Sequence, residues 1–193
     1  DLAAPTISYP GSVRSLEVIS EWPVDHAAAA VVTRDGGVVA STGDQRAVYS
    51  LASVTKPLVA YAALVAIEEG AIELDQPAGP PGSTVRHLLA HASGLAFGER
   101  TVAAEPGRKR IYSSAGFEVL GELIATESDI AFPDYVPQAV FEPLGMGDSS
   151  LPGPAGHGGR SSAADLAVFA GELLAPTLVS DVLFGEATDV QFP

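Results

Sequence analysis

Apolar residues are concentrated in one uninterrupted run early in the chain. Residues 58–67 contain no charged side chain, and acidic residues and a glycine at 68–70 end the run. A helix that is apolar on every side belongs in the centre of a protein rather than on its surface. We therefore predict a buried central helix that begins with Ser53 as its N-cap. Pro57 then falls in the opening turn, where backbone N–H groups lack partners within the helix.

Two β-favouring runs stand ahead of this helix. Residues 27–33 and 38–42 are rich in Ala, Val and Thr, and Asp35 and Gly36 lie between them. An Asp-Gly pair between two such runs is a strong signal for a β-hairpin. The pattern predicts two antiparallel strands immediately before the central helix.

Two further helices are predicted in the middle of the chain. Ser83 and Thr84 precede an apolar run and are good N-caps, and Gly94 is placed to close the short helix that they open. After a loop, the spacing of apolar residues over 117–124 predicts a second, buried helix just behind Tyr112.

The last part of the chain is less regular. Residues 132–146 have a helical pattern, but Pro137 should bend or end a helix there. Ser162 followed by Asp165 is close to a capping box and opens the last clear helix, which Pro176 ends. The inner face of that helix is predicted to carry Leu166, Phe169 and Leu173. A short amphipathic piece is expected over 13–19, and no firm periodicity follows Pro176.

Composition limits the classes of function. The chain has 193 residues, of which 47% are hydrophobic, and this suits a single globular domain over residues 1–193. Its formal net charge is −14, so we expect no nucleic acid partner and no anionic membrane surface as partner, because both would repel it. The absence of cysteine excludes disulfides and thiolate chemistry. The longest apolar run is too short to span a bilayer.

The sequence leaves the compartment open. The first residues, Asp1 to Thr6, lack the basic and apolar segments of a signal peptide. A cytoplasmic protein and a processed extracytoplasmic protein would both look this way, so the localisation stays unknown.

His87 and His91 stand four positions apart, on one face of the predicted short helix, and this spacing invites a metal site. No third ligand cluster and no His-Glu-x-x-His pattern accompanies them. Ordinary helix histidines are the better interpretation, and we expect neither a metal nor a cofactor.

The start of the central helix carries candidate catalytic chemistry. Ser53 and Lys56 are three positions apart, which places a hydroxyl and an amine on one face. The positive end of the helix would stabilise an oxyanion there, and with burial it would lower the pKa of Lys56 until the amine accepts the serine proton. Taken alone, Ser-x-x-Lys is more often an N-cap beside a solvated lysine, and Tyr112 more often an anchoring aromatic residue. The wider pattern therefore decides.

Four stretches, in the same order, resemble the penicillin-recognising serine hydrolases: class C β-lactamases, D-alanyl-D-alanine peptidases and related esterases. The sequence SVTKP at 53–57 resembles the nucleophile motif of that family, and YSSAGF at 112–117 resembles its tyrosine motif. Residues 87–95 resemble the helix and turn after the nucleophile. Residues 141–146, with 158–166, resemble a structural stretch near the far wall of the site.

The resemblance implies an α/β (α+β) fold of the β-lactamase/transpeptidase type, in which helices and a helical region flank an antiparallel sheet. It also implies that Ser53 attacks a carbonyl and becomes acylated, that Lys56 and Tyr112 together move the proton, and that water then releases the acyl group. The backbone N–H of Ser53 would be one oxyanion donor. The expected substrates are small-molecule esters, β-lactams or peptides.

One departure from the family concerns the substrate. Ser114 stands where the family usually has Asn, and a hydroxyl reaches less far toward a substrate amide than an amide side chain does. We assign Ser114 to substrate binding and favour an esterase over a β-lactamase or a peptidase. A penicillin-fold binding or sensor protein that no longer turns over is the alternative, and a purely structural helical domain is the least favoured interpretation.

The second departure is an absent motif. No Lys-Thr-Gly or His-x-Gly sequence on a plausible strand follows residue 165, and His157 lies in a Gly-rich loop, so we do not accept it as the substitute. A hairpin beside helices would have an exposed apolar edge, which natural proteins avoid. We therefore expect one of two situations. Either the domain lacks its C-terminal strands because it is truncated or cleaved, or a second polypeptide or chain segment completes the sheet. Without completion, we expect low activity.

Overall fold

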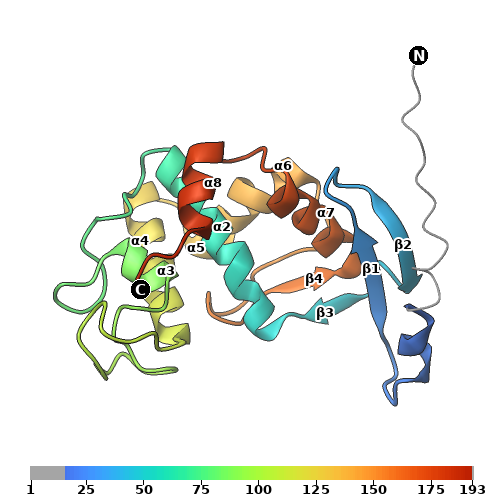
Figure 1. Ribbon diagram of the computed structural model, residues 1–193, viewed down its shortest axis with the longest axis horizontal. Helices are drawn as coiled ribbons and strands as arrows, with labels where there is room; N and C mark the ends of the chain where they lie inside the picture. Colours follow the sequence, from blue (N-terminus) through green and yellow to red (C-terminus); the bar gives the residue numbers. More distant parts are fainter. Residues whose placement is uncertain (1–15, 193) are drawn as a thin grey trace.

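The computed structural model describes residues 16–192, whose elements pack around one long helix (Figure 1). This helix, α2 (Thr55–Glu68), runs through the middle of the molecule and buries Leu58, Tyr61 and Leu64 among other residues. The predicted buried central helix is therefore confirmed. None of the described helices is long and apolar enough to cross a membrane.

The predicted start of this helix at Ser53 was wrong. Residues Ala52–Val54 form a short 3₁₀ turn, η2, and Val54 is the N-cap of α2. Ala52 has a φ of 45°, in the left-handed region, so the chain turns sharply just before Ser53. The turn moves the start of the α-helix beyond Ser53, and the Ser53 side chain makes no capping bond to the helix.

The predicted hairpin is confirmed. Strand β1 (Ala28–Val32) pairs antiparallel with β2 (Val38–Gly43), with the turn between Thr33 and Gly37. A short strand that the sequence did not predict, β3 (Val48–Ser50), follows and pairs antiparallel with β4 (Arg160–Ser162). Within residues 16–192 the two pairs form separate two-stranded sheets, and Figure 1 shows the hairpin at the end of the molecule away from α4.

The middle of the chain forms helices that pack on and around α2. They are α3 (Val85–Leu89), α4 (Ser114–Ser128), α5 (Phe132–Val136), the π-helical turn η3 (Pro137–Phe141) and α6 (Glu142–Leu144). The buried face of α4 carries Phe117, Leu120 and Ile124, as the apolar spacing predicted. Pro137 ends the regular α-helix but not the helical course of the chain, which continues through η3.

The predicted closure of α3 by Gly94 was wrong. The helix ends at Leu89, and His91 takes a left-handed φ of 58° that turns the chain out of the helix. Gly94, with a φ of +84°, lies against the backbone of Ala104, where a Cβ would come within 2.0 Å of the carbonyl oxygen. Its small size therefore serves the next turn instead.

The C-terminal part forms two helices, α7 (Ala163–Leu174) and α8 (Asp181–Thr188). Ser162 caps α7 by accepting from the backbone N–H of Asp165, which confirms the predicted start. Of the predicted inner residues, Phe169 is buried and Leu166 is half-buried, but Leu173 is 37% exposed, so its prediction was wrong. Helix α8 was not predicted.

The short piece expected over 13–19 is described only in part. Residues 13–15 lie outside the described residues. The remainder leads into a 3₁₀ turn, η1 (Val18–Glu21), in which Ile19 is buried.

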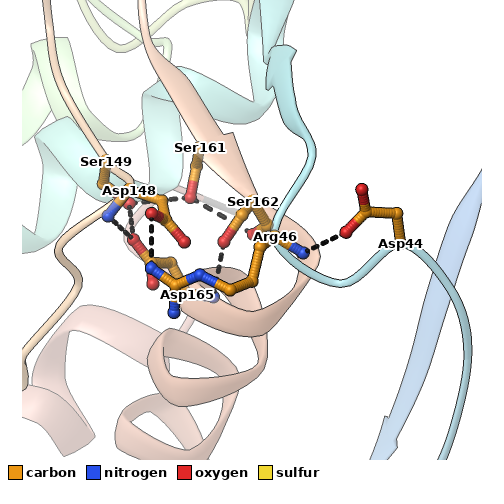
Figure 2. Close-up of polar contacts among 7 residues, drawn as sticks. All are labelled: Asp44, Arg46, Asp148, Ser149, Ser161, Ser162 and Asp165. Atoms are coloured by element: carbon orange, nitrogen blue, oxygen red, sulfur yellow. Dashed lines mark hydrogen bonds and ion pairs between the residues drawn. The ribbon is translucent and has the colours of Figure 1, made fainter.

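A polar cluster joins β4 and the start of α7 to two loops (Figure 2). The carboxylate of Asp165 accepts from the backbone N–H of Asp148 at 2.8 Å and from the Ser149 hydroxyl at 2.7 Å. Arg46, which follows β2, pairs with Asp148 at 2.8 Å. The Ser149 hydroxyl also lies 2.7 Å from that of Ser161 in β4. Because buried polar groups cost free energy unless they are bonded, this contact fixes the position of β4 and, through it, of β3.

Candidate active site

Ser53 lies in η2, at the positive end of α2. The preceding residue, Ala52, holds a left-handed φ of 45°, a strained conformation for a residue with a Cβ. Such strain is concentrated at functional sites. In the first turn of α2, Lys56 turns toward this residue, and its Nζ donates to Ser53 Oγ at 3.2 Å. The structure thus brings together the first two predicted site residues.

The amine of Lys56 is almost fully enclosed, with the residue only 3% exposed. Besides Ser53, its Nζ donates to Ser114 Oγ at 3.0 Å and to the Gly156 carbonyl at 2.7 Å. An ammonium group has three N–H donors, so these three acceptors match a protonated lysine. All three are uncharged.

Tyr112 comes from the loop just ahead of α4 and lies beside the same amine. The Lys56 Nζ is 4.6 Å from the centroid of the Tyr112 ring. The pKa of the phenol is lowered, chiefly by its contact with the Ser53 hydroxyl and then by the Lys56 ammonium. Tyr112 is 44% exposed, so part of its side chain is open to solvent.

Ser114, the fourth predicted site residue, begins α4 and is buried. Its oxygen accepts from Lys56, and its own O–H is left to donate to another group. A role in substrate binding stays a prediction for this residue, and the contact with Lys56 gives it a second task, holding the amine.

A cleft opens beside Ser53. It has a volume of about 340 Å³ and is bounded by Ser53, Phe97, Gly98, Ser114, Ala115, Glu118, Pro154 and His157. A smaller, apolar cavity of about 130 Å³ lies between α2, α3 and α8 and contains none of the four predicted residues. The cleft is therefore the candidate active site, because it alone of the two opens on the serine.

Glu118 was not predicted as a site residue, but it holds the loop that carries Gly156 beside Lys56. Its carboxylate accepts from the backbone N–H groups of Ala155 at 3.2 Å and Gly156 at 2.9 Å, and the Gly156 carbonyl in turn accepts from Lys56. The only signal in the sequence was its position four residues after Ser114, on the same face of the helix.

The two histidines that invited a metal interpretation each have a protein partner. His87 Nδ1 lies 2.9 Å from Thr84 Oγ1, and His91 Nδ1 accepts from the backbone N–H of Ser113 at 3.1 Å. Among residues 16–192 there is no group of three or more His, Cys, Asp or Glu side chains that could hold a metal ion.

Comparison with known proteins matches most of the chain to one family. A family profile described as Beta-lactamase covers residues 24–189. Penicillin-binding protein 4* from Bacillus subtilis is 25% identical over 136 residues, which is 53% of this chain and 30% of the relative. The matched part is therefore much shorter than the curated relative.

Solved structures have the same fold. A beta-lactamase from Mycobacterium bovis superposes with a TM-score of 0.90 and 56% identity, covering 93% of this chain and 66% of that one. A penicillin-binding protein from Bacillus halodurans has a TM-score of 0.77 at 18% identity, covering 92% of this chain and 77% of that one. A D-stereospecific amidohydrolase from Streptomyces sp. has a TM-score of 0.74 at 21% identity and covers 93% and 77%. The last two show likeness of fold alone.

Proposed function

The chain belongs to the beta-lactamase family and has a β-lactamase/transpeptidase-like fold, as its sequence predicted. From that premise we propose that it is a serine acyl hydrolase. The observation that carries the proposal is the position of one buried amine. Lys56 Nζ lies within hydrogen-bond distance of Ser53 Oγ and Ser114 Oγ, and it faces the Tyr112 ring at 4.6 Å from the ring centroid. A nucleophile, a cation and a phenol of lowered pKa therefore lie together beside the cleft that Ser53 and Ser114 line.

Acylation follows from these contacts. Ser53 Oγ attacks the substrate carbonyl carbon while its proton passes to the phenolate of Tyr112, and the Lys56 ammonium stabilises that phenolate and donates to the serine oxygen. The backbone N–H of Ser53, at the positive end of α2, donates to the oxyanion. As the bond to the leaving group breaks, the Tyr112 proton passes to the leaving oxygen or nitrogen, and the acyl group stays on Ser53.

Deacylation repeats the same proton transfer with water. Tyr112 accepts a proton from the attacking water, the oxygen of the water bonds to the acyl carbon, and the proton returns to Ser53 Oγ as the ester bond to the serine breaks. The products are a carboxylic acid and free Ser53. Throughout, Tyr112 carries the proton and the Lys56 ammonium stabilises the phenolate, which is the form that the joint role implied by the family resemblance takes in this proposal.

We favour esters over β-lactams and peptides as substrates. Ser114 stands in place of the family's Asn, and its oxygen is already engaged by Lys56, so it offers a substrate amide one short donor. Ester bonds need less recognition at this position. The alternative is a binding or sensor protein that is acylated without turnover, and Ser114 in place of the family's Asn supports it as well.

One experiment tests these functions. The protein is incubated with a chromogenic short-chain ester and, separately, with a fluorescent penicillin, and is compared with Ser53→Ala. Ser41→Ala, on the exposed side of β2, is the matched control. For a hydrolase, Ser53→Ala lowers ester turnover by at least about 10³-fold, and Ser41→Ala leaves it unchanged. Stoichiometric labelling by the penicillin without turnover supports the sensor, and no reaction with either reagent contradicts both.

We also propose that a further strand, from a second polypeptide or chain segment, pairs with β1. Within the described residues β1 pairs only with β2, and its residues are half-buried. Trp22 and Val24, which are 54% and 57% exposed, lie at a groove beside this strand. The chain spans 66% of the length of the Mycobacterium bovis beta-lactamase.

A further inference from the structure

The position of Tyr112 needs an explanation that its own contacts do not give. The residue lies in a loop and is 44% exposed, yet the proposed mechanism needs its phenol held against Ser53 and Lys56. Loop residues move more than residues in helices and strands. Some neighbouring residue must therefore fix the loop, and His91 makes the contacts that do so.

His91 contacts the backbone on both sides of Tyr112. Its carbonyl accepts from the N–H of Ile111 at 2.8 Å, and its Nδ1 accepts from the N–H of Ser113 at 3.1 Å. One residue therefore binds the backbone N–H groups one position before and one position after the tyrosine. With both groups fixed, the Tyr112 Cα has little freedom to move.

The ring of His91 also supports the phenol ring directly. The two ring centroids are 4.6 Å apart, and the His91 ring lies 5.2 Å from that of Phe117 in α4. His91 is only 8% exposed. Its left-handed φ of 58° is unusual for a residue with a side chain, and such strained positions are found where function requires them.

The contacts define one protonation state of the imidazole. Nδ1 accepts a hydrogen bond, so in neutral His91 the proton is on Nε2. Burial, followed by the positive charges of Lys56 and Arg110, lowers the pKa of His91 to about 4. At neutral pH the side chain is therefore uncharged and keeps its acceptor.

We propose that His91 is a positioning residue that holds the Tyr112 phenol against Ser53 and Lys56, by binding the peptide groups on both sides of Tyr112 and packing against its ring. The importance of this role rests on the proposed hydrolase function, but the contacts themselves are testable without it. Neither the spacing of His87 and His91 nor the family motif indicated this role.

The test compares two variants that suit a left-handed backbone. His91→Gly removes the ring and the acceptor, while His91→Asn keeps an acceptor oxygen close to the position of Nδ1. The readout is the ionisation of Tyr112, measured by tyrosinate absorbance as the difference from Tyr112→Phe. We expect the pKa of Tyr112 to lie below its ordinary value of about 10 in the wild-type protein, to rise toward 10 in His91→Gly, and to stay low in His91→Asn.

Kinetics with the chromogenic ester give the second readout. We expect kcat to fall about 10²-fold in His91→Gly with KM nearly unchanged, and to recover most of this loss in His91→Asn. The control is His87→Asn, one turn earlier on α3, where His87 contacts Thr84 and Phe192 instead and kcat should not change.

An unchanged Tyr112 titration in a His91→Gly protein that melts cooperatively overturns the proposal. If that variant does not fold, NMR of the wild-type protein replaces it. Protonation of His91 near pH 4 should then move the Tyr112 ring signals with the same midpoint, and signals that do not follow His91 overturn the proposal. A shifted titration in a protein without hydrolytic activity supports the positioning role and contradicts only the proposed function.

Discussion

The charge on Lys56 dominates the site at the scale of single residues. The amine is buried, and its three hydrogen-bond acceptors are hydroxyl and carbonyl oxygens rather than carboxylates. No ion pair with Lys56 is found within residues 16–192. A buried cation is costly without a nearby negative charge. The Tyr112 phenol is the group placed to supply that charge, and the Lys56 ammonium adds to the lowering of its pKa, which comes chiefly from the Ser53 hydroxyl.

The pH dependence of hydrolysis should therefore follow Tyr112. Its pKa lies below its ordinary value, chiefly through Ser53 and then through Lys56. The phenol is protonated and inactive below this pKa, so kcat/KM should rise with pH through it and level off above it. We expect Tyr112→Phe to lose about 10²- to 10⁴-fold in kcat/KM and to lose this acid limb.

A pH profile of ester hydrolysis checks this prediction. Tyr49→Phe is the matched control, because the buried Tyr49 hydroxyl has no hydrogen-bond partner among residues 16–192 and should not contribute. The prediction fails if Tyr112→Phe retains the wild-type profile.

At the scale of elements, α7 is joined to α2 through one buried carboxylate. Glu172 is 5% exposed and accepts from the Tyr61 hydroxyl of α2. It also accepts from the backbone N–H groups of Thr177 and Leu178, each at 2.8 Å. Burial raises the pKa of Glu172, but the hydrogen bonds from Tyr61, Thr177 and Leu178 outweigh it and lower the pKa overall. The ionised form is therefore the one that stabilises the fold.

We predict that Glu172→Gln lowers the free energy of unfolding by about 1–3 kcal/mol at neutral pH, because an amide cannot accept all of these bonds. A carboxylate with a lowered folded-state pKa stabilises the protein above its unfolded-state value of about 4.3, and this contribution disappears as the pH falls through the folded-state pKa. The gap between the variant and the wild-type protein should thus close in acid.

Urea unfolding at neutral and acidic pH measures this gap. Glu142→Gln, at an exposed position in α6, provides the comparison and should stay close to wild type at every pH. A Glu172→Gln variant with the same deficit at all pH values would contradict the role of the charge.

Sequence patterns predicted the elements whose signals are local. The apolar run of α2, the Asp-Gly turn between β1 and β2, and the Ser162 cap of α7 each lie within a few residues. Strands β3 and β4 were missed because each has three residues and its partner is more than a hundred positions away. Leu173 was predicted on the inner face of α7, but it is exposed. Its neighbour Glu172 is the buried residue instead, because it accepts a hydrogen bond from Tyr61.

The candidate site was predictable to the same extent. Ser53 and Lys56 are three positions apart, so local geometry was enough to pair them, whereas Tyr112 was found only through the family resemblance. Glu118 and His91 were missed, since each acts through backbone groups that the fold brings to it. The roles of the four predicted residues, and the single domain over 1–193, stay predictions.

At the scale of the whole molecule, the edge of β1 that faces away from β2 is where we propose that a further strand is added. The hairpin lies at one end of the molecule, with α7 packed against β1 (Figure 1). Half of the backbone groups of an edge strand point away from its partner. An added strand would pair with those groups on β1 and would cover the groove beside Trp22 and Val24.

Hydrogen exchange along β1 tests whether such a strand is added. In the 193-residue chain by itself, we expect the amides of Ala28–Val32 that point away from β2 to exchange quickly, while those paired with β2 are protected. In the protein purified from its own source, an added strand should slow the outer amides by about 10²-fold or more and raise ester turnover in parallel. Intact mass of that material then shows whether the strand comes from a longer chain or from a second polypeptide. Equal exchange of the outer amides in both preparations would contradict the added strand, because a strand paired with that edge must protect those amides.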